Sequence, residues 1–336
     1  MSPLHPKVRF ESLSSTDAVL VAFSGGPDST FLLHQVATFF TGTKRAVYFD
    51  HGLRAPEVLA AEKAIVTACA QALDVVLVQQ SLPIQQTAAE TGMSVEEAGH
   101  HLRRKALKTL AKSQGIAHVL TGHHRDDHIE TLLLQWIRGT GSGWAGITPA
   151  SDLGDGLTLH RPLLGLRKAE ILGFLAKQKM GFVTDTTNLE PTFLRNKIRH
   201  QVLPLLSSIN PTFEETLLKA AATAQEKAQY WEEQAAPILA RFMTCETGFS
   251  VPFALLKPLP KPILSHVLWR FLSQAQQRAE LGAEQVVSAG HIDTLMQLIQ
   301  TDQSIGLDLP GLWRVVLKAD YLWLEKTTYR RRRALR

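Results

Sequence analysis

Short apolar runs alternate with amphipathic stretches over the first 140 residues of the chain. Runs that are apolar throughout are typical of strands buried on both faces of a parallel sheet. We predict strands at 18–23, 45–50, 74–79 and 117–122. Apolar residues at helical spacing predict helices at 30–40, 56–73, 94–112 and 126–138. Strands alternating with helices indicate an α/β fold with a doubly wound parallel sheet and right-handed crossovers.

The pattern changes near residue 210. A long helix with a Gln-, Glu- and Lys-rich face is predicted at 211–236 and suggests a connector. Further helices are expected at 261–279 and 288–301, followed by a β-hairpin with strands at 312–317 and 321–324. We therefore predict a first domain over 1–208 and a smaller, mainly helical C-terminal domain over 209–336 that ends in a β-hairpin.

A loop of small residues joins the first strand to the first helix. It reads Ser24, Gly25, Gly26, Pro27, Asp28 and Ser29. The glycines allow a sharp turn and a close approach to a ligand, and the N–H groups at a helix start favour an anion. Either Asp28 or Ser29 is expected to cap the helix. No Gly-Lys-Ser/Thr follows, so this is not a Walker loop. We interpret the loop as a phosphate cradle, with an ordinary tight turn as the alternative.

Polar residues follow the second and fourth predicted strands. Ligands of doubly wound sheets bind beyond the carboxyl ends of the strands. Asp50 and His51 follow one strand, and the dense polar segment 122–131 follows the other. These ends and the cradle are therefore expected to converge on one crevice.

Three interpretations of segment 122–131 stay open. Asp127 and Glu130 could hold a Mg2+ ion beside a bound phosphate, with a histidine stabilising charge on that phosphate. His124 and His128 stand four residues apart, as zinc ligands do, although the His-Glu-x-x-His pattern is absent. The segment could also be an exposed polar helix start. Further on, 141–146 matches G-x-G-x-x-G but follows a helix, so a dinucleotide site is not indicated.

Composition narrows the class of protein. The chain is 45% hydrophobic and 20% charged, as globular proteins are. It has no apolar run of eighteen residues and no signal-peptide pattern, so we expect a cytoplasmic protein without a membrane segment. Its two cysteines are far apart, which argues against a disulfide framework. The net charge of +5 equals the charge of the arginine-rich tail at 330–336, which could bind a polyanion or simply be a solubilising tail.

The motifs resemble those of a known family. The loop at 24–29 resembles the pyrophosphatase loop (PP-loop) of enzymes that cleave ATP between its α and β phosphates. The ordered set of motifs between residues 18 and 206 is similar to that of the tRNA(Ile)-lysidine synthases. That set comprises 24–29, 49–54, 122–127, 138–141, 161–164, 185–188, 195–200 and 203–206.

This resemblance implies an adenine nucleotide alpha hydrolase-like (PP-loop) fold and a two-step reaction. ATP, with Mg2+, adenylates the C2 oxygen of the wobble cytidine in the CAU anticodon of tRNA(Ile). The side-chain amine of free L-lysine then displaces AMP to give lysidine. The modification changes the codon read from AUG to AUA and the amino acid from methionine to isoleucine.

The resemblance also implies site residues. ATP would be bound by Ser24, Gly25, Gly26, Pro27, Asp28, Ser29, Asp50 and His51, and the catalytic residues would be Asp28, Arg103, His123 and Asp127. Mg2+ would be held by Asp28 and Asp127, and tRNA by Arg195, Lys197 and Arg199. The chain departs from the family pattern at His100, Arg104, His128 and Thr187.

Other functions remain to be weighed against this one. A tRNA-thiolating enzyme of the same superfamily normally needs paired cysteines, which Cys69 and Cys245 do not provide. A small-molecule amidating ligase and a non-catalytic tRNA-binding protein with a vestigial ATP site are further alternatives. The sequence leaves open whether the chain is a monomer or a homodimer, and it does not locate the lysine pocket.

Overall fold

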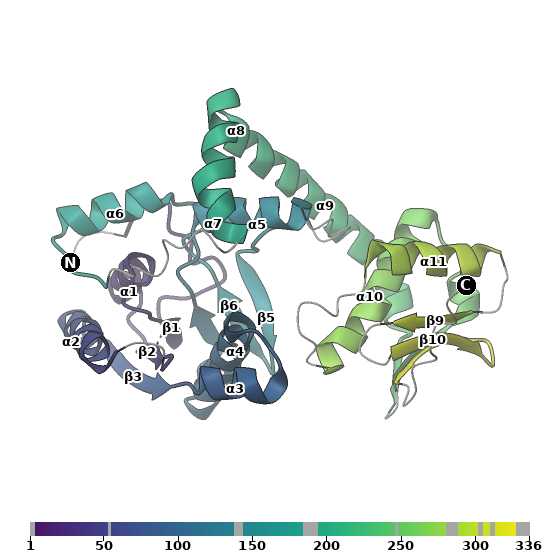
Figure 1. Cartoon of the computed structure of the whole chain (residues 1–336), viewed down its shortest axis with the longest axis horizontal. Coiled ribbons are helices and arrows are strands. Elements are labelled where there is room, and N and C mark those ends of the chain that lie inside the picture. Colours follow the sequence, from purple (N-terminus) through teal and green to yellow (C-terminus); the bar gives the residue numbers. More distant parts are fainter. Residues whose placement is uncertain are drawn as a thin grey trace. The chain divides into compact units, whose positions relative to one another are not determined.

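The computed structural model describes residues 4–52, 55–137, 144–183, 194–245, 248–279, 288–301, 305–309 and 313–326 (Figure 1). Parts of the predicted motifs lie outside these ranges, namely 53–54, 138–143, 185–188 and the tail at 330–336. No helix in the described residues has the length and apolarity needed to span a bilayer.

The chain divides into two compact units. The first unit comprises Met1–Leu134 and Gly146–Leu217, and the second comprises Gln135–Ala145 and Leu218–Arg336. We predicted a division after residue 208, whereas the units divide after Leu217. Two helices, α5 (Arg125–Ile137) and α9 (Phe213–Leu239), contribute residues to both units.

The first unit contains a six-stranded sheet in the order β3-β2-β1-β4-β6-β5. All neighbouring strands are parallel except β5, which pairs antiparallel with β6. The predicted doubly wound sheet is therefore confirmed, and the β5–β6 hairpin was not predicted. The strands are β1 (Val19–Ala22), β2 (Lys44–Asp50), β3 (Val76–Ser81), β4 (His118–Leu120), β5 (Ala150–Gly154) and β6 (Leu157–His160).

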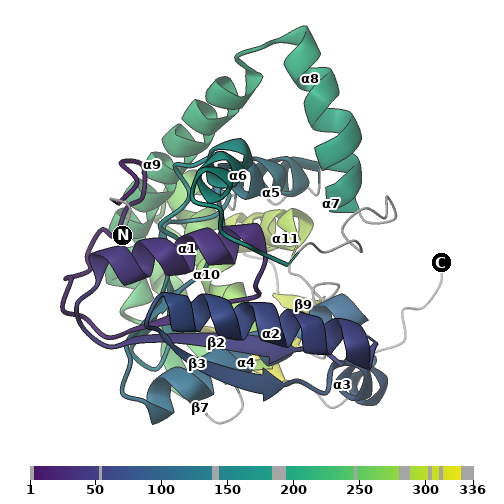
Figure 2. The same ribbon diagram turned by 90° about the vertical axis from the view of Figure 1, so that its left-hand side faces the viewer.

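Alternate residues of the central strands face two different cores. Val19 and Val21 pack in one core with α1 (Pro27–Phe39), α2 (Pro56–Ala72) and α6 (Lys168–Lys177). Leu20 faces the other side, where it packs with residues of α4 (Val95–Ser113). Figure 2 shows α1 and α2 running along the same side of β2 and β3. A further helix, α3 (Ile84–Thr91), precedes α4.

The start of α1 differs from the prediction. The helix begins at Pro27 with Gly26 as its N-cap, and no side chain caps it. The predicted caps Asp28 and Ser29 are wrong because both lie inside the first turn. Proline fits the first helical position since its fixed φ suits the helix and its missing N–H would have no helical partner there. Ser29 Oγ instead donates to the Gly26 carbonyl at 3.0 Å.

A short helical segment precedes α9 in the first unit. It consists of α7 (Leu194–Lys197), the π-helical turn η3 (Ile198–Val202) and α8 (Leu203–Ile209). Ile198 is fully buried and anchors the segment. This segment carries the three basic residues predicted to bind tRNA.

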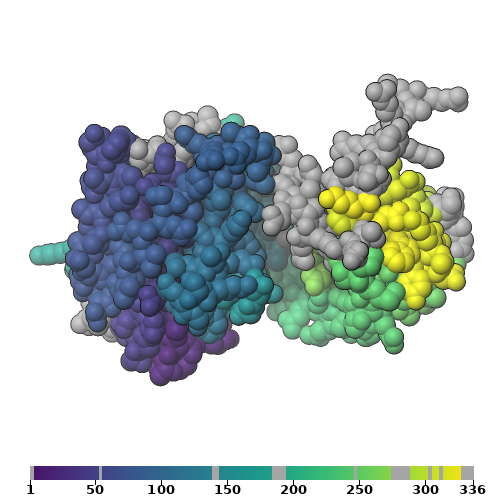
Figure 3. All heavy atoms as spheres, turned by 90° about the horizontal axis from the view of Figure 1, so that it is seen from below, coloured from purple at the N-terminus to yellow at the C-terminus, as the bar shows by residue number. Residues whose placement is uncertain are grey.

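The second unit contains a five-stranded antiparallel sheet in the order β7-β8-β11-β10-β9. The predicted hairpin is β10–β11, which turns at Ala319 and Asp320, both with positive φ. Three further strands were not predicted. Figure 3 shows the yellow hairpin residues beside green residues of the same unit. The remaining elements are β7 (Met243–Cys245), β8 (Gly248–Pro252), η4 (Phe253–Leu255), α10 (Lys261–Ala279), α11 (Ala289–Gln300), β9 (Gly306–Leu309), β10 (Trp313–Lys318) and β11 (Tyr321–Lys326).

Candidate active site

The loop at 24–29 lies between β1 and α1 and is held tightly from behind. Gly25 has a φ of +77°, and a Cβ added there would lie 2.5 Å from Val66 Cγ1. Its carbonyl accepts a hydrogen bond from the Val183 N–H at 2.8 Å. A glycine is therefore required by both the backbone conformation and the packing. These contacts fix the loop at the carboxyl end of the central strand.

The exit of β4 packs directly against this loop. A Cβ added to Gly122 would lie 3.1 Å from the Asp28 carbonyl carbon. His123 and His124 follow Gly122 and precede α5. The predicted convergence of these two segments is observed.

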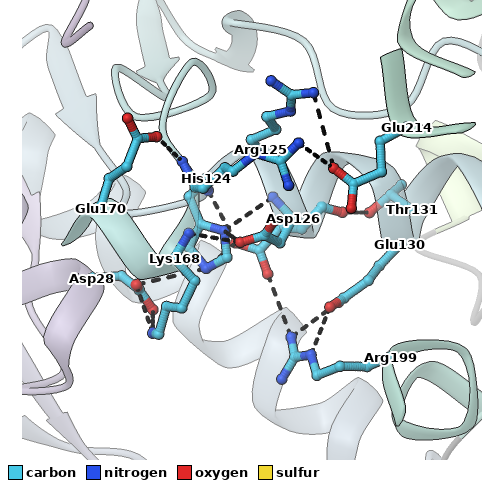
Figure 4. Close-up of polar contacts among 12 residues, drawn as sticks. Asp28, His124, Arg125, Asp126, Glu130, Thr131, Lys168, Glu170, Arg199 and Glu214 are labelled. Carbon is cyan, nitrogen blue, oxygen red and sulfur yellow. Dashed lines mark hydrogen bonds and ion pairs between the residues drawn. The ribbon is translucent and has the colours of Figure 1, made fainter. Parts of the chain in front are cut away.

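Asp28 meets two cationic or titratable groups from other elements. Lys168 Nζ, at the start of α6, donates to both carboxylate oxygens of Asp28 at 2.6 Å (Figure 4). His124 Nε2 lies 3.6 Å from Asp28 Oδ1. Sequence reasoning missed Lys168, because 140 residues separate it from Asp28 and nothing local marks it.

His124 is buried between carboxylates, with 4% of its surface exposed. Its Nε2 lies 3.4 Å from Asp127 Oδ2, and its Nδ1 accepts from the Asp126 N–H at 3.2 Å. Burial alone would raise the pKa of Asp127, but His124, its backbone N–H and Arg195 outweigh burial and lower that pKa. The Asp127 carboxylate is therefore ionised at neutral pH.

Asp126 joins the start of α5 to the start of α6. Its Oδ2 accepts the backbone N–H of Lys168 at 2.7 Å. The bond satisfies one of the N–H groups that a helix start leaves unpaired. Because it fixes the Lys168 backbone, it also sets where the lysine side chain begins.

His123, predicted to be catalytic, lies beside the same cluster. Its Nδ1 is 2.9 Å from Thr121 Oγ1. Burial lowers the pKa of His123, Asp127 opposes this effect, and Arg161 and Arg195 add to it. The imidazole is therefore neutral at pH 7, and two cationic groups, Arg161 and Arg195, lie near it together with the Asp127 carboxylate.

Glu130 is the most deeply buried acid of the site, with 1% of its surface exposed. It accepts from Arg195 Nε at 2.8 Å and from Arg199 Nε at 2.6 Å. Arg195 Nη2 also donates to Asp127 Oδ1 at 3.1 Å. The hydrogen bond to Glu130 raises the pKa of Arg199. Two of the predicted tRNA-binding residues thus pair with site carboxylates, whereas Lys197 is exposed.

Asp50 and Arg103 make hydrogen bonds outside this cluster. Asp50 accepts from the Gly52 N–H at 2.9 Å and from Lys63 Nζ at 3.1 Å. Arg103 Nε donates to the Gly99 carbonyl within α4 at 3.1 Å, and burial lowers the pKa of Arg103. His51, the last of the predicted ATP-binding residues, directly follows β2. The catalytic prediction for Arg103 stays a prediction.

The donor set suits Mg2+ better than zinc. No group of three or more His, Cys, Asp or Glu side chains in the described part of the chain could hold a metal by itself. His128 Nδ1 accepts the Ile147 N–H at 2.8 Å, so it faces the backbone. Asp28 and Asp127, in contrast, both lie near the same atom, His124 Nε2. Mg2+ is commonly held by one or two carboxylates together with substrate phosphates, which fits this pair.

The first unit matches a known family model. Residues 5–206 match the PP-loop domain model ATP_bind_3, which implies the use of ATP. Among solved structures, a U34-tRNA thiolase, NcsA from Methanococcus maripaludis, superposes with a TM-score of 0.55. The alignment covers 66% of this chain and 76% of that one at 13% identity, so the likeness concerns the fold alone.

Curated relatives cover most of the chain. A tRNA(Ile)-lysidine synthase of Dehalococcoides mccartyi is 33% identical over 92% of this chain and 66% of the relative. A bifunctional protein TilS/HprT of Listeria innocua is 29% identical over 92% of this chain and 47% of the relative. The chain thus spans between about half and two thirds of the length of these relatives. A tRNA(Ile)-lysidine synthase of Polaromonas naphthalenivorans is 34% identical over 79% of each chain. Together with the PP-loop match, this similarity shows that the chain belongs to the tRNA(Ile)-lysidine synthase family of PP-loop proteins.

Proposed function

We propose that this protein is an ATP-dependent ligase that converts the wobble cytidine of tRNA(Ile) with a CAU anticodon into lysidine. The cytidine C2 oxygen attacks the α-phosphate of ATP, and pyrophosphate leaves. The side-chain amine of free L-lysine then attacks C2, loses a proton and displaces AMP. The names of the curated relatives support this assignment, and we expect the reaction to occur in the cytoplasm.

The observation that carries the proposal is the cluster at the start of α5. It joins Asp28 of the loop to Asp127 through the buried His124. Neutral His123 and two arginines border the same space. A nucleotide lying with its phosphates on the loop would place its α-phosphate beside these groups, where negative charge builds in the first step.

Each residue then has a defined task. The loop residues Ser24 to Ser29 hold the phosphates through backbone N–H groups and hydroxyls. His123, with Arg161 and Arg195 near it, stabilises charge on the α-phosphate. Lys197, exposed on α7, contacts the tRNA backbone. Arg195 or Arg199 joins it if a tRNA phosphate replaces Glu130 as the partner of that arginine.

Asp28 and Asp127 would hold the magnesium ion that accompanies ATP. When bound, the ion neutralises phosphate charge and so eases departure of pyrophosphate. Our prediction is that Asp28→Ala abolishes lysine transfer while leaving the fold intact, because Asp28 is partly exposed and packs no core. Circular dichroism checks the fold, and an adenylation assay checks the activity.

The decisive experiment incubates purified protein with ATP, magnesium, radiolabelled lysine and unmodified tRNA(Ile) bearing a CAU anticodon. We expect label to enter the tRNA. The matched control replaces the wobble cytidine with uridine and should take up no label.

The outcomes separate the candidate functions. Pyrophosphate release with another acceptor would retain the adenylating site and reject lysidine formation. Absence of both lysine transfer and pyrophosphate release would favour the alternative of a non-catalytic tRNA-binding protein with a vestigial ATP site. Unchanged adenylation by Asp28→Ala would show that the loop assignment is wrong.

A further inference from the structure

The phosphate loop lacks a cation of its own. Residues 24–29 contain no lysine or arginine and include one carboxylate, Asp28. The backbone N–H groups and the start of α1 supply only a partial positive charge, roughly half an elementary charge. A bound pyrophosphate carries several negative charges, so the loop by itself is electrostatically incomplete.

Lys168 places an ammonium group at this loop from a distant part of the chain. Its Nζ lies 2.6 Å from both Asp28 Oδ1 and Asp28 Oδ2. Asp28 is the second residue of α1, so Nζ lies at the helix start where anions are favoured. In Figure 4 the lysine side chain extends from α6 toward Asp28.

The base of Lys168 is fixed, whereas its side chain is partly exposed to solvent. Its backbone N–H is held by Asp126 Oδ2 at 2.7 Å, and α6 is anchored by the fully buried Ile171 and Leu175. The side chain itself is 36% exposed, so Nζ can swing on a four-carbon stem without disturbing a core. A firmly placed helix therefore presents the ammonium group to the loop on a long side chain with no other partner in the described part of the core.

We propose that Lys168 is the phosphate-binding lysine of this ATP site and that it exchanges partners when the nucleotide binds. Without nucleotide, Nζ pairs with the Asp28 carboxylate. With nucleotide, it pairs with the pyrophosphate end of ATP, and Asp28 is released to hold the cation. The Asp28 carboxylate thus accepts the hydrogen bonds from Lys168 Nζ that a bound phosphate would accept. This inference rests on the proposed ATP site at the loop.

The first test measures ligand binding by calorimetry, without turnover. We expect Lys168→Gln to bind ATP and pyrophosphate about 10- to 100-fold more weakly, the range for a lost charge-assisted hydrogen bond. AMP lacks the pyrophosphate end, so its affinity should stay within about twofold. Lys168→Met, which keeps most of the apolar stem, should show the same pattern.

Lys7→Gln is the matched control. It removes one positive charge from the same unit and breaks a lysine–carboxylate pair with α6, Lys7 Nζ to Glu170 Oε1 at 2.6 Å. Its binding of all three ligands should equal that of the unchanged protein. Equal losses in Lys7→Gln and Lys168→Gln would reduce the effect to net charge and overturn the proposal.

A double-mutant cycle tests the exchange itself. In metal-free buffer, Asp28→Asn should strengthen pyrophosphate binding because it removes a repelling charge and releases Lys168. In the Lys168→Gln background only the repulsion is removed, so the gain should be at least about threefold smaller. Equal gains in both backgrounds would mean that the two side chains do not compete.

The results also separate this inference from the proposed function. If the unchanged protein binds ATP and pyrophosphate but Lys168→Gln binds them equally well, the lysine assignment is wrong and the ATP site stands. If the unchanged protein binds neither ligand, both the ATP site and the inference fall.

Discussion

At the scale of single residues, the site carboxylates are already paired with cations. Glu130 is held by Arg195 and Arg199, and Asp28 by Lys168. A buried carboxylate without such partners would be strongly disfavoured or protonated. The arginines that we predicted to bind tRNA therefore also stabilise the fold, and tRNA phosphates would have to compete with Glu130 for them.

Glu130→Gln should destabilise the first unit by about 1–3 kcal/mol. The change leaves two guanidinium groups without their carboxylate, and the expected loss lies below that of a fully buried pair because both arginines are partly exposed. Urea unfolding measures the loss.

Asp155→Asn is the control for Glu130→Gln. Asp155 pairs with Lys108 at 3.2 Å and Lys112 at 2.8 Å on the surface. Such exposed pairs contribute little, so no measurable change is expected. A Glu130 variant as stable as the Asp155 variant would show that the buried pairing does not stabilise the unit.

At the scale of elements, the phosphate loop depends on how closely α2 approaches it. Gly25 combines a positive φ with contact to Val66, one of the fully buried residues of α2. The loop conformation is therefore imposed jointly by its own glycine and by a helix packed behind it. A larger side chain would be resisted by both.

Gly25→Ala should reduce the free energy of unfolding by more than its positive φ alone explains. Left-handed backbone costs alanine roughly 1–2 kcal/mol, and the overlap with Val66 adds about 1–3 kcal/mol. Gly92→Ala is the matched control, because Gly92 has a φ of +71° with nothing within 4 Å of the added Cβ. Urea unfolding gives both losses and calorimetry gives ATP affinity. Equal losses for the two variants would contradict the packing argument.

At the scale of the whole molecule, the described histidines with a lowered pKa are concentrated in the first unit. Burial is the largest cause lowering the pKa of each. They are His34, His100, His123, His128 and His160 in the first unit, against His291 in the second. A histidine with a lowered folded pKa binds protons more readily when unfolded. Its contribution to the stability of the fold is therefore lost as the pH falls below about 6.5, the pKa of histidine in the unfolded chain.

Mild acid should consequently destabilise the first unit more than the second. Between about pH 7 and pH 5.5, before most carboxylates titrate, we expect the urea midpoint of the first unit to fall more than that of the second. Pulse labelling of thiols separates the units, since Cys69 lies in the first and Cys245 in the second. Tryptophan fluorescence gives a second readout, because all six tryptophans belong to the second unit. Parallel shifts of both midpoints would contradict the prediction.

The sequence determined the elements with long, regular patterns. The bounds of α10 match the predicted 261–279, and the four central parallel strands lie where apolar runs indicated. The loop at 24–29 and the exit of β4 could also be predicted, because strand order places such ends together. Short strands such as β5, β7 and β9 escaped prediction, because each mixes apolar residues with polar residues or glycine and so forms no continuous apolar run.

Only the tertiary structure decided which charges meet. Lys168 reaches Asp28 across 140 residues, and Arg195 and Arg199 reach Glu130 across 65 and 69. No local pattern encodes these pairs, since each depends on how two helices pack around a shared sheet. The sequence by itself therefore predicted the family, the fold and the conformationally special loop at 24–29. The packing of α5, α6 and α7 decided the electrostatics of the site, because a charge interacts with its neighbours in space and not with its neighbours in the chain.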